Sequence, residues 1–169
     1  HLEVGMGLVA DVFSDARLKK LFGSIAIGHN RYSTTGVSRV KNAQPCLIEY
    51  SGGTVAMGHN GNLVNASEIR RELSAAGAIF QSTNDSEVVV HLMAQSLRNS
   101  FVDRAVAALS LVKGAYSIVL MSENELIAAR DPRGFRPLCL GKLGEAYIVA
   151  SESCVMDLVE AKYIREIEP

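Results

Sequence analysis

Polar side chains crowd three short segments, each of which follows a run of apolar residues or opens a helical pattern. The segments are 28–36 (GHNRYSTTG), 57–63 (MGHNGNL) and 82–87 (STNDSE). Loops at the ends of secondary-structure elements carry binding and catalytic residues more often than the interiors of those elements do. We therefore take these three segments as the candidate site.

The first segment could bind an anion through Arg31. A guanidinium group presents paired N–H donors whose geometry matches a carboxylate or a phosphate. The hydroxyl groups of Ser33, Thr34 and Thr35 follow closely and could add donors. A polar turn that carries a surface arginine accounts for the same pattern, so the residue types leave both interpretations open.

The second segment contains the pair Asn60-Gly61, which in many proteins forms the turn of a hairpin. Here a helical pattern starts within four residues, which disfavours a plain hairpin. The Asn60 amide and the Gly61 N–H are adjacent donors that could converge on one oxygen, which is the chemistry of an oxyanion hole. An ordinary turn stays the alternative.

The third segment opens a helix and offers one acid, Asp85. Asp and Asn are preferred at helix N-termini, so helix capping explains Asp85 without any ligand. If its carboxylate is free of that task, Asp85 could instead hold an ammonium group.

Two other features fit structural roles. His29 and His59 each precede an asparagine, but no acid or cysteine is spaced to form a triad with them, so we interpret both as structural histidines. Residues 131–137 (DPRGFRP) predict a rigid turn held by local ion pairs. The alternative is that Arg133 and Arg136 contact an anionic ligand or a neighbouring domain.

Composition narrows the function classes. The 169 residues carry 17 Lys+Arg and 18 Asp+Glu, and this net charge of −1 argues against a nucleic-acid-binding module. No apolar run is long enough for a membrane-spanning helix. Cys46, Cys139 and Cys154 lack metal-ligand spacing, so we expect free thiols in a cytoplasmic protein. The length favours one domain.

Hydrophobic periodicity predicts the elements that position these segments. One helix opens with a capping box from Asn65 to Glu68, and another, after Ser100, turns Val102, Ala105, Val106 and Leu109 inward. The expected strands cover 24–30, 45–50, 54–60, 114–121, 125–130, 137–141, 145–151 and 162–168, and the expected helices cover 65–76, 84–97, a stretch after Ser100, 153–160 and, more weakly, 15–21.

Strands thus precede and follow a block of helices, with hairpins between neighbouring strands. This order predicts an α+β fold with two mainly antiparallel sheets. Strands that are apolar on both faces need cover on both sides. We therefore predict a four-layer αββα sandwich.

Five motifs occur in one order that resembles the glutaminase domain of the amidophosphoribosyltransferase family. They are 28–36, 42–45 (NAQP), 58–63 (GHNGNL), 83–87 (TNDSE) and 131–137. That domain is a class II glutamine amidotransferase with the N-terminal nucleophile hydrolase fold. The likeness covers nearly the whole chain, and RYSTTG followed by NAQP is its most specific part.

The resemblance implies a role for each candidate residue. Arg31 would bind the α-carboxylate of glutamine, with Thr34 beside it, and Asp85 would bind the α-ammonium group. The side chain of Asn60 and the backbone N–H of Gly61 would form the oxyanion hole. These roles agree with the chemistry of the residue types.

The nucleophile of the family is the amino-terminal cysteine of the mature enzyme, whose own α-amine serves as base. This sequence begins with His1, and none of its cysteines matches that motif. We therefore expect residues 1–169 to be a partial glutaminase domain, truncated at the amino end and inactive alone. A phosphoribosyltransferase domain is expected after residue 169. The resemblance implies Mg²⁺ in that second domain and no cofactor or metal in this one.

The implied function is to supply ammonia that converts phosphoribosyl pyrophosphate to phosphoribosylamine, the first step of purine synthesis. The expected partners are glutamine and the phosphoribosyltransferase domain of a homo-oligomeric parent, with no nucleic acid or membrane. Two alternatives stay open. The chain could be a non-catalytic glutamine-binding or assembly module, or the glutaminase domain of another class II amidotransferase.

Overall fold

A computed structural model describes residues 1–31 and 40–169. Its larger sheet contains four antiparallel strands in the order β1-β2-β3-β4. A smaller sheet contains three antiparallel strands in the order β6-β5-β7. The strands are β1 (Cys46–Tyr50), β2 (Gly53–Leu63), β3 (Gly114–Met121), β4 (Leu126–Arg130), β5 (Cys139–Leu143), β6 (Ala146–Ala150) and β7 (Lys162–Glu166).

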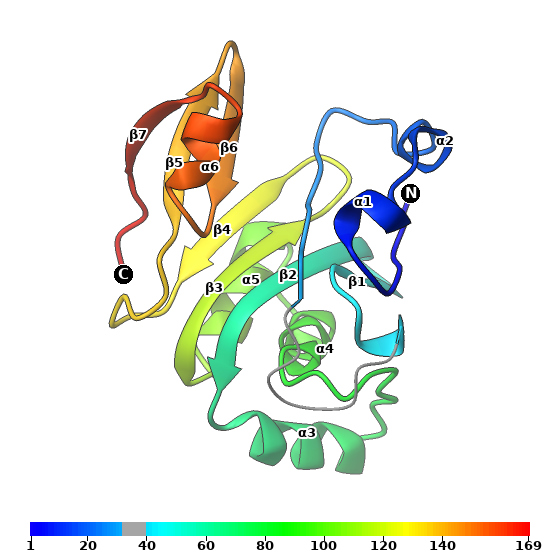
Figure 1. Ribbon diagram of the computed structural model, residues 1–169. Helices are drawn as coiled ribbons and strands as arrows, with labels where there is room; N and C mark the ends of the chain where they lie inside the picture. The colour runs from blue at the N-terminus through cyan, green and yellow to red at the C-terminus, as the bar shows by residue number, and fades with distance from the viewer. Residues whose placement is uncertain (32–39) are drawn as a thin grey trace.

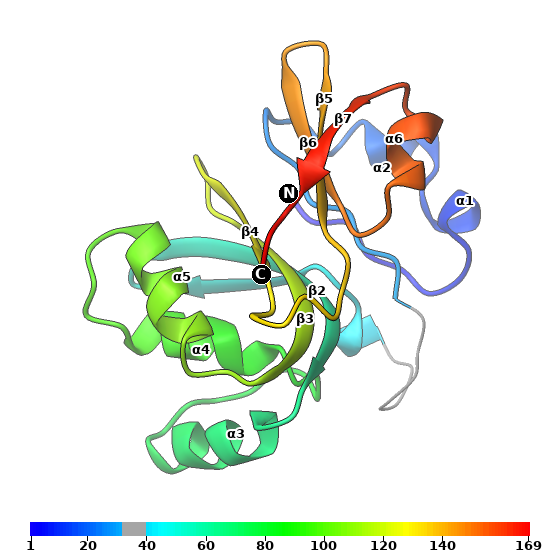
Figure 2. The same cartoon turned by 90° about the vertical axis from the view of Figure 1, so that its left-hand side faces the viewer.

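Helices lie outside both sheets (Figures 1 and 2). They are α1 (Val9–Val12), α2 (Asp15–Leu18), α3 (Ala66–Ala75), α4 (Glu87–Gln95), α5 (Phe101–Leu109) and α6 (Cys154–Leu158), with a 3₁₀ helix at Val40–Asn42. Figure 2 shows α3, α4 and α5 on one side of the larger sheet and the smaller sheet, with α6, on the other. The fold is α+β with two antiparallel sheets, as predicted.

The main core lies between the larger sheet and the helices α3 to α5. Tyr116, Ile118 and Leu120 of β3 lie in this core, as the period-2 alternation of the sequence predicts. Val55 and Met57 of β2 occupy the same layer. Alternation therefore places His59 on the helix side of β2 and Asn60 on the opposite face.

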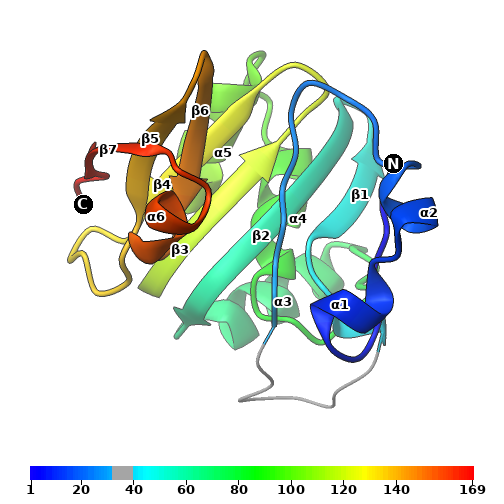
Figure 3. The same ribbon diagram turned by 45° about the horizontal axis from the view of Figure 1, so that its top comes forward.

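The segment expected to form a strand at 24–30 is extended but is not a strand. Ile25, Ile27 and His29 are half-buried and the residues between them are exposed, so the alternation is real. A Cβ built on Gly58 would lie 3.5 Å from Ile27 Cγ2 and 3.7 Å from His29 Nδ1. The segment therefore lies across the face of β2 instead of along a strand edge, where a ladder could form (Figure 3).

Two helix predictions need correction. In α5 the buried residues are Ala105 and Ala108, whereas Val102 and Val106 are exposed. Helix α3 forms as predicted, but the Asn65 side chain makes no capping hydrogen bond. Its amide instead donates to the Leu111 carbonyl and accepts the Lys113 N–H. Among the described residues, no helix is long and apolar enough to cross a membrane.

Candidate functional site

Asp85 lies at the junction of β2 and α4. Its Oδ2 accepts the Leu63 N–H at 2.8 Å, and its Oδ1 accepts the Ser86 N–H at 2.8 Å. His59 Nδ1 lies 3.5 Å from Oδ1. The bond to Ser86 is local and does not cap α4, whereas the bond to Leu63 ties the carboxylate to the end of a different element.

The environment of Asp85 keeps its carboxylate ionised. Burial alone would raise the pKa of Asp85, but hydrogen bonds from His59 and from the backbone of Leu63 and Ser86 outweigh burial and lower the pKa. The side chain is still 30% exposed. A charged acceptor is therefore accessible at the end of β2.

Asn60 and Gly61 belong to β2 and do not form a hairpin turn. They pair with Ser117 and Tyr116 of β3, and β2 continues to Leu63. The φ of Gly61 is +149°, and an added Cβ would collide with the carbonyl oxygen of Ala115. Only glycine fits this position, because the neighbouring backbone approaches so closely. The two proposed oxyanion donors thus sit near the end of a strand that ends beside Asp85.

Residues 42–44 connect β2 to the loop that carries Asp85 through hydrogen bonds. The Gln44 side chain accepts the His59 N–H at 2.7 Å and donates to the His59 carbonyl at 3.3 Å. Buried Asn42 donates to Thr83 Oγ1 at 2.9 Å and accepts the Thr83 N–H at 3.0 Å. The Asn84 side chain donates to the Asn42 carbonyl at 3.2 Å. Three of the sequence motifs are therefore joined by hydrogen bonds.

Arg31 lines a different part of the same region. It borders a cavity of about 100 Å³, together with His29, Asn30 and residues 42–44. Burial, followed by the nearby charges of His59 and Arg31, lowers the pKa of His29 to about 4, so His29 is neutral near neutral pH. The cavity does not include Asp85, Asn60 or Gly61, but its lining residues Asn42 and Gln44 form hydrogen bonds to Thr83, Asn84 and His59, which neighbour these residues in the sequence. Thr34 lies outside the described residues.

The loop before Asp85 depends on two residues for which the sequence suggested no role, Glu87 and Arg70. Buried Glu87 accepts the N–H groups of Gln81 and Ser82 at 2.7 and 2.9 Å. Arg70 donates to the carbonyls of Ser82 and Asn84 at 3.1 and 2.6 Å. The sequence signal that could have indicated a buried role for Glu87 is its position directly before three consecutive valines.

Glu87 is held in its charged form. Burial would raise the pKa of Glu87, but the nearby His91 ring, with Nε2 3.7 Å from Oε1, and hydrogen bonds from Ser82 and the Gln81 backbone outweigh burial and lower the pKa to about 2. The 81–84 loop is therefore clamped between a carboxylate from α4 and a guanidinium from α3.

The turn at 131–137 forms, but it is not held by the expected ion pairs. The fully buried Asp131 carboxylate accepts four backbone N–H groups, from Tyr116, Arg133, Phe135 and Arg136. Burial would raise the pKa of Asp131, and these backbone bonds lower it instead. The turn wraps around one buried carboxylate, so it anchors the chain between β4 and β5.

The cysteines do not resemble activated nucleophiles. Burial raises the pKa of Cys46 to about 11. Burial also raises the pKa of Cys139, and Cys154 is exposed. A thiol becomes nucleophilic when its pKa falls, so the environments of Cys46 and Cys139 work in the opposite direction. Among the described residues, no group of His, Cys, Asp and Glu is placed to hold a metal ion.

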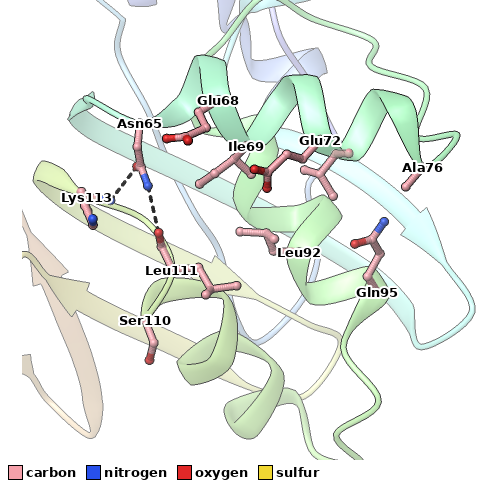
Figure 4. Close-up of a pocket in the computed structure, with 11 residues that line it drawn as sticks. Asn65, Glu68, Ile69, Glu72, Ala76, Leu92, Gln95, Ser110, Leu111 and Lys113 are labelled. Carbon is pink, nitrogen blue, oxygen red and sulfur yellow. Dashed lines mark hydrogen bonds between the residues drawn. The ribbon is translucent and has the colours of Figure 1, made fainter.

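A larger cavity, of about 560 Å³, lies in the helical layer away from these residues (Figure 4). Residues of α3 and α4 and the connection from α5 to β3 line it. Its walls include Ile69, Leu92 and Leu111, and the Asn65 bonds to Leu111 and Lys113 brace one end. None of the predicted site residues borders it, so volume alone does not locate the candidate site.

Comparisons with known proteins identify the family to which the chain is similar. Residues 29–157 match a family model described as "Glutamine amidotransferase domain". Amidophosphoribosyltransferase 2, chloroplastic, of Arabidopsis thaliana is 49% identical over 166 residues, which cover 98% of this chain and 30% of that protein. Amidophosphoribosyltransferase of Bacillus subtilis is 46% identical, over 98% of this chain and 35% of that protein.

Two solved structures match closely. The B. subtilis glutamine phosphoribosylpyrophosphate amidotransferase, complexed with ADP and GMP, superimposes with a TM-score of 0.90 at 45% identity, over 96% of this chain and 35% of that chain. A structure titled as the allosteric regulatory enzyme of purine biosynthesis gives a TM-score of 0.93 at 46% identity, over 98% and 36%. The chain thus spans about a third of the length of these relatives.

Proposed function

The chain belongs to the glutamine amidotransferase domain family, and from this we propose that it is the glutamine-hydrolysing domain of an amidophosphoribosyltransferase. Its substrate is glutamine, and the ammonia it releases is used by a phosphoribosyltransferase domain of the same parent protein. There, ammonia displaces pyrophosphate from phosphoribosyl pyrophosphate.

One observation carries the proposal: an ionised, partly exposed Asp85 is fixed at the end of the strand that contains Asn60 and Gly61. Glutamine presents an ammonium group, a carboxylate and a side-chain amide. An acid for the ammonium group thus lies at the end of the strand that carries the two donors for the amide oxygen. Arg31 supplies the cation for the carboxylate, from the segment that crosses β2.

The reaction is an acyl transfer. A cysteine thiolate attacks the side-chain amide carbon of glutamine, and the resulting oxyanion is stabilised by the Asn60 amide and the Gly61 N–H. Ammonia leaves, and water hydrolyses the thioester to glutamate. The raised pKa values of Cys46 and Cys139 disfavour these thiols as the nucleophile. The nucleophile proposed from the resemblance to the family is the amino-terminal cysteine of the mature enzyme. No step in this domain needs a cofactor.

Glutamine binding and hydrolysis by the full-length protein test the proposal. We expect Asp85→Asn and Arg31→Leu each to weaken L-glutamine binding by roughly 10–100-fold, because each removes a charge-assisted hydrogen bond. The matched controls are Asp157→Asn and Arg71→Leu, which alter exposed residues on α6 and α3. Unchanged affinity in both site variants would refute the proposed site. Binding without hydrolysis would instead favour the non-catalytic glutamine-binding module.

A further inference from the structure

His59 is the buried side chain that contacts Asp85 most directly. Its imidazole is 2% exposed, and its Nδ1 faces Asp85 Oδ1 at 3.5 Å. Its backbone N–H and carbonyl are both bonded to the Gln44 side chain. The other ring nitrogen, Nε2, is buried and has no hydrogen-bond partner among the described residues. The ring is thus fixed at its backbone and has Asp85 as its polar partner.

The directions of the contacts to Asp85 limit how this carboxylate can bind a ligand. An ionised carboxylate has about four acceptor sites. The N–H groups of Leu63 and Ser86 occupy two of them, and His59 Nδ1 faces a third. A ligand ammonium group must use the acceptor site that remains on the exposed part of the side chain.

We propose that His59 is a positioning residue that sets the orientation of the Asp85 carboxylate and so determines how strongly the site recognises an α-ammonium group. This inference rests on the proposed glutamine-binding function. The ring is a donor to Asp85 only when Nδ1 carries hydrogen. Without this donor only the two backbone bonds hold the carboxylate, and its remaining acceptor site is less firmly directed at the ligand.

The test compares two ligands that differ only in the α-ammonium group: L-glutamine and 4-carbamoylbutanoate. The full-length protein is titrated with each ligand by calorimetry, and KM and kcat for L-glutamine are measured in parallel. We expect His59→Leu to weaken L-glutamine binding roughly 10-fold, as for loss of a hydrogen bond to a charged group, and 4-carbamoylbutanoate binding by less than about 2-fold. KM should rise while kcat changes little.

Two further variants separate positioning from packing. The amide nitrogen of His59→Asn can reach the position of Nδ1, whereas that of His59→Gln reaches the position of Nε2. We expect the Asn variant to retain most of the preference for L-glutamine and the Gln variant to lose it. The His59→Asn and His59→Gln variants also test the proposal if the His59→Leu variant does not fold. Equal weakening of both ligands, or equal behaviour of the Asn and Gln variants, would overturn the proposal.

The same titrations distinguish this proposal from the proposed function. If Asp85→Asn abolishes the preference for L-glutamine but His59→Leu retains it, the function stands and the role of His59 is wrong. If the unmodified protein shows no preference between the two ligands, the glutamine site itself is wrong, and the role of His59 is overturned with it.

Discussion

The side chain of Gln44 pairs with the backbone of His59 as another strand would. It accepts the His59 N–H at 2.7 Å and donates to the His59 carbonyl at 3.3 Å. The ladder between β1 and β2 begins at the pair Cys46 and Met57, so residue 44 stands opposite residue 59 in the same register. The Gln44 amide thus continues the ladder past Pro45, which has no N–H to donate.

Replacing Gln44 by Leu should destabilise the protein, because both hydrogen bonds to the His59 backbone are lost. The His59 N–H would be buried without a partner, which costs about 1–3 kcal/mol of unfolding free energy. We expect faster hydrogen exchange of the His59 amide and weaker glutamine binding. Gln95→Leu, at an exposed position of α4, is the control. Unchanged protection of the His59 amide in Gln44→Leu would contradict the assignment.

Glu87 should make stability depend on acid pH. Its pKa falls from 4.5 to about 2 on folding, so the ionised group stabilises the fold fully above pH 4.5. That contribution disappears as the pH falls from 4.5 to about 2. Relative to Glu87→Gln, the unmodified protein should lose on the order of 3 kcal/mol over this window. Urea unfolding of both proteins between pH 6 and about 2.5 measures the difference.

The comparison with Glu87→Gln removes the contributions of the other carboxylates, which titrate in both proteins. Glu72→Gln, at an exposed position of α3, provides the control and should show no such pH-dependent difference. A constant difference between Glu87→Gln and the unmodified protein across the window would show that Glu87 is not held ionised by the loop.

Asp131→Asn should destabilise the protein strongly even though the two side chains have nearly the same shape. The Asn amide nitrogen carries hydrogens that would face backbone N–H groups, where the carboxylate accepts four of them. We expect a loss of about 2–4 kcal/mol in chemical denaturation. The exposed Asp157→Asn substitution should change stability by less than about 0.5 kcal/mol. Similar small effects in both variants would disprove the role of the buried carboxylate.

Gly61→Ala should prevent normal pairing of β2 with β3. The added methyl group would collide with the Ala115 carbonyl, at a φ of +149° that L-residues rarely adopt. We expect little folded protein, measured as soluble yield and cooperative thermal unfolding. Gly28→Ala is the matched control, because a Cβ there meets nothing within 4 Å. A folded Gly61→Ala variant with normal unfolding would contradict the close approach of the strands.

Sequence patterns predicted those parts of the fold that depend on local periodicity. The alternation of Tyr116, Ile118 and Leu120 in the sequence matches the buried face of β3, and the helical spacing of Ile69 and Leu73 matches the buried face of α3. In α5 periodicity placed Ala105 and Leu109 against the core correctly, but it also selected Val102 and Val106, which are exposed, and it missed buried Ala108. The extended segment at 24–30 failed as a strand because pairing depends on distant partners.

The site was predictable by residue type more than by arrangement. The chemistry of Asp85 makes it a candidate from the sequence alone, but its bond to the Leu63 N–H joins elements far apart in sequence. The same holds for Gln44 and His59, whose link depends on the register of two strands. Glu87 lies within the motif 83–87, but the sequence does not indicate its role, because a loop held by hydrogen bonds leaves no periodic signal.

The contacts made by residues 42–44 have a consequence for how this site could be altered. Gln44 holds residue 59 through its backbone N–H and carbonyl, and Asn42 holds residue 83 partly through its backbone N–H. Because these bonds use backbone atoms, any residue except proline can form them at positions 59 and 83. A library that randomises these two positions and keeps Asn42 and Gln44 would therefore vary the chemistry of the site on an unchanged frame, which makes the pair a starting point for directed evolution of ligand preference.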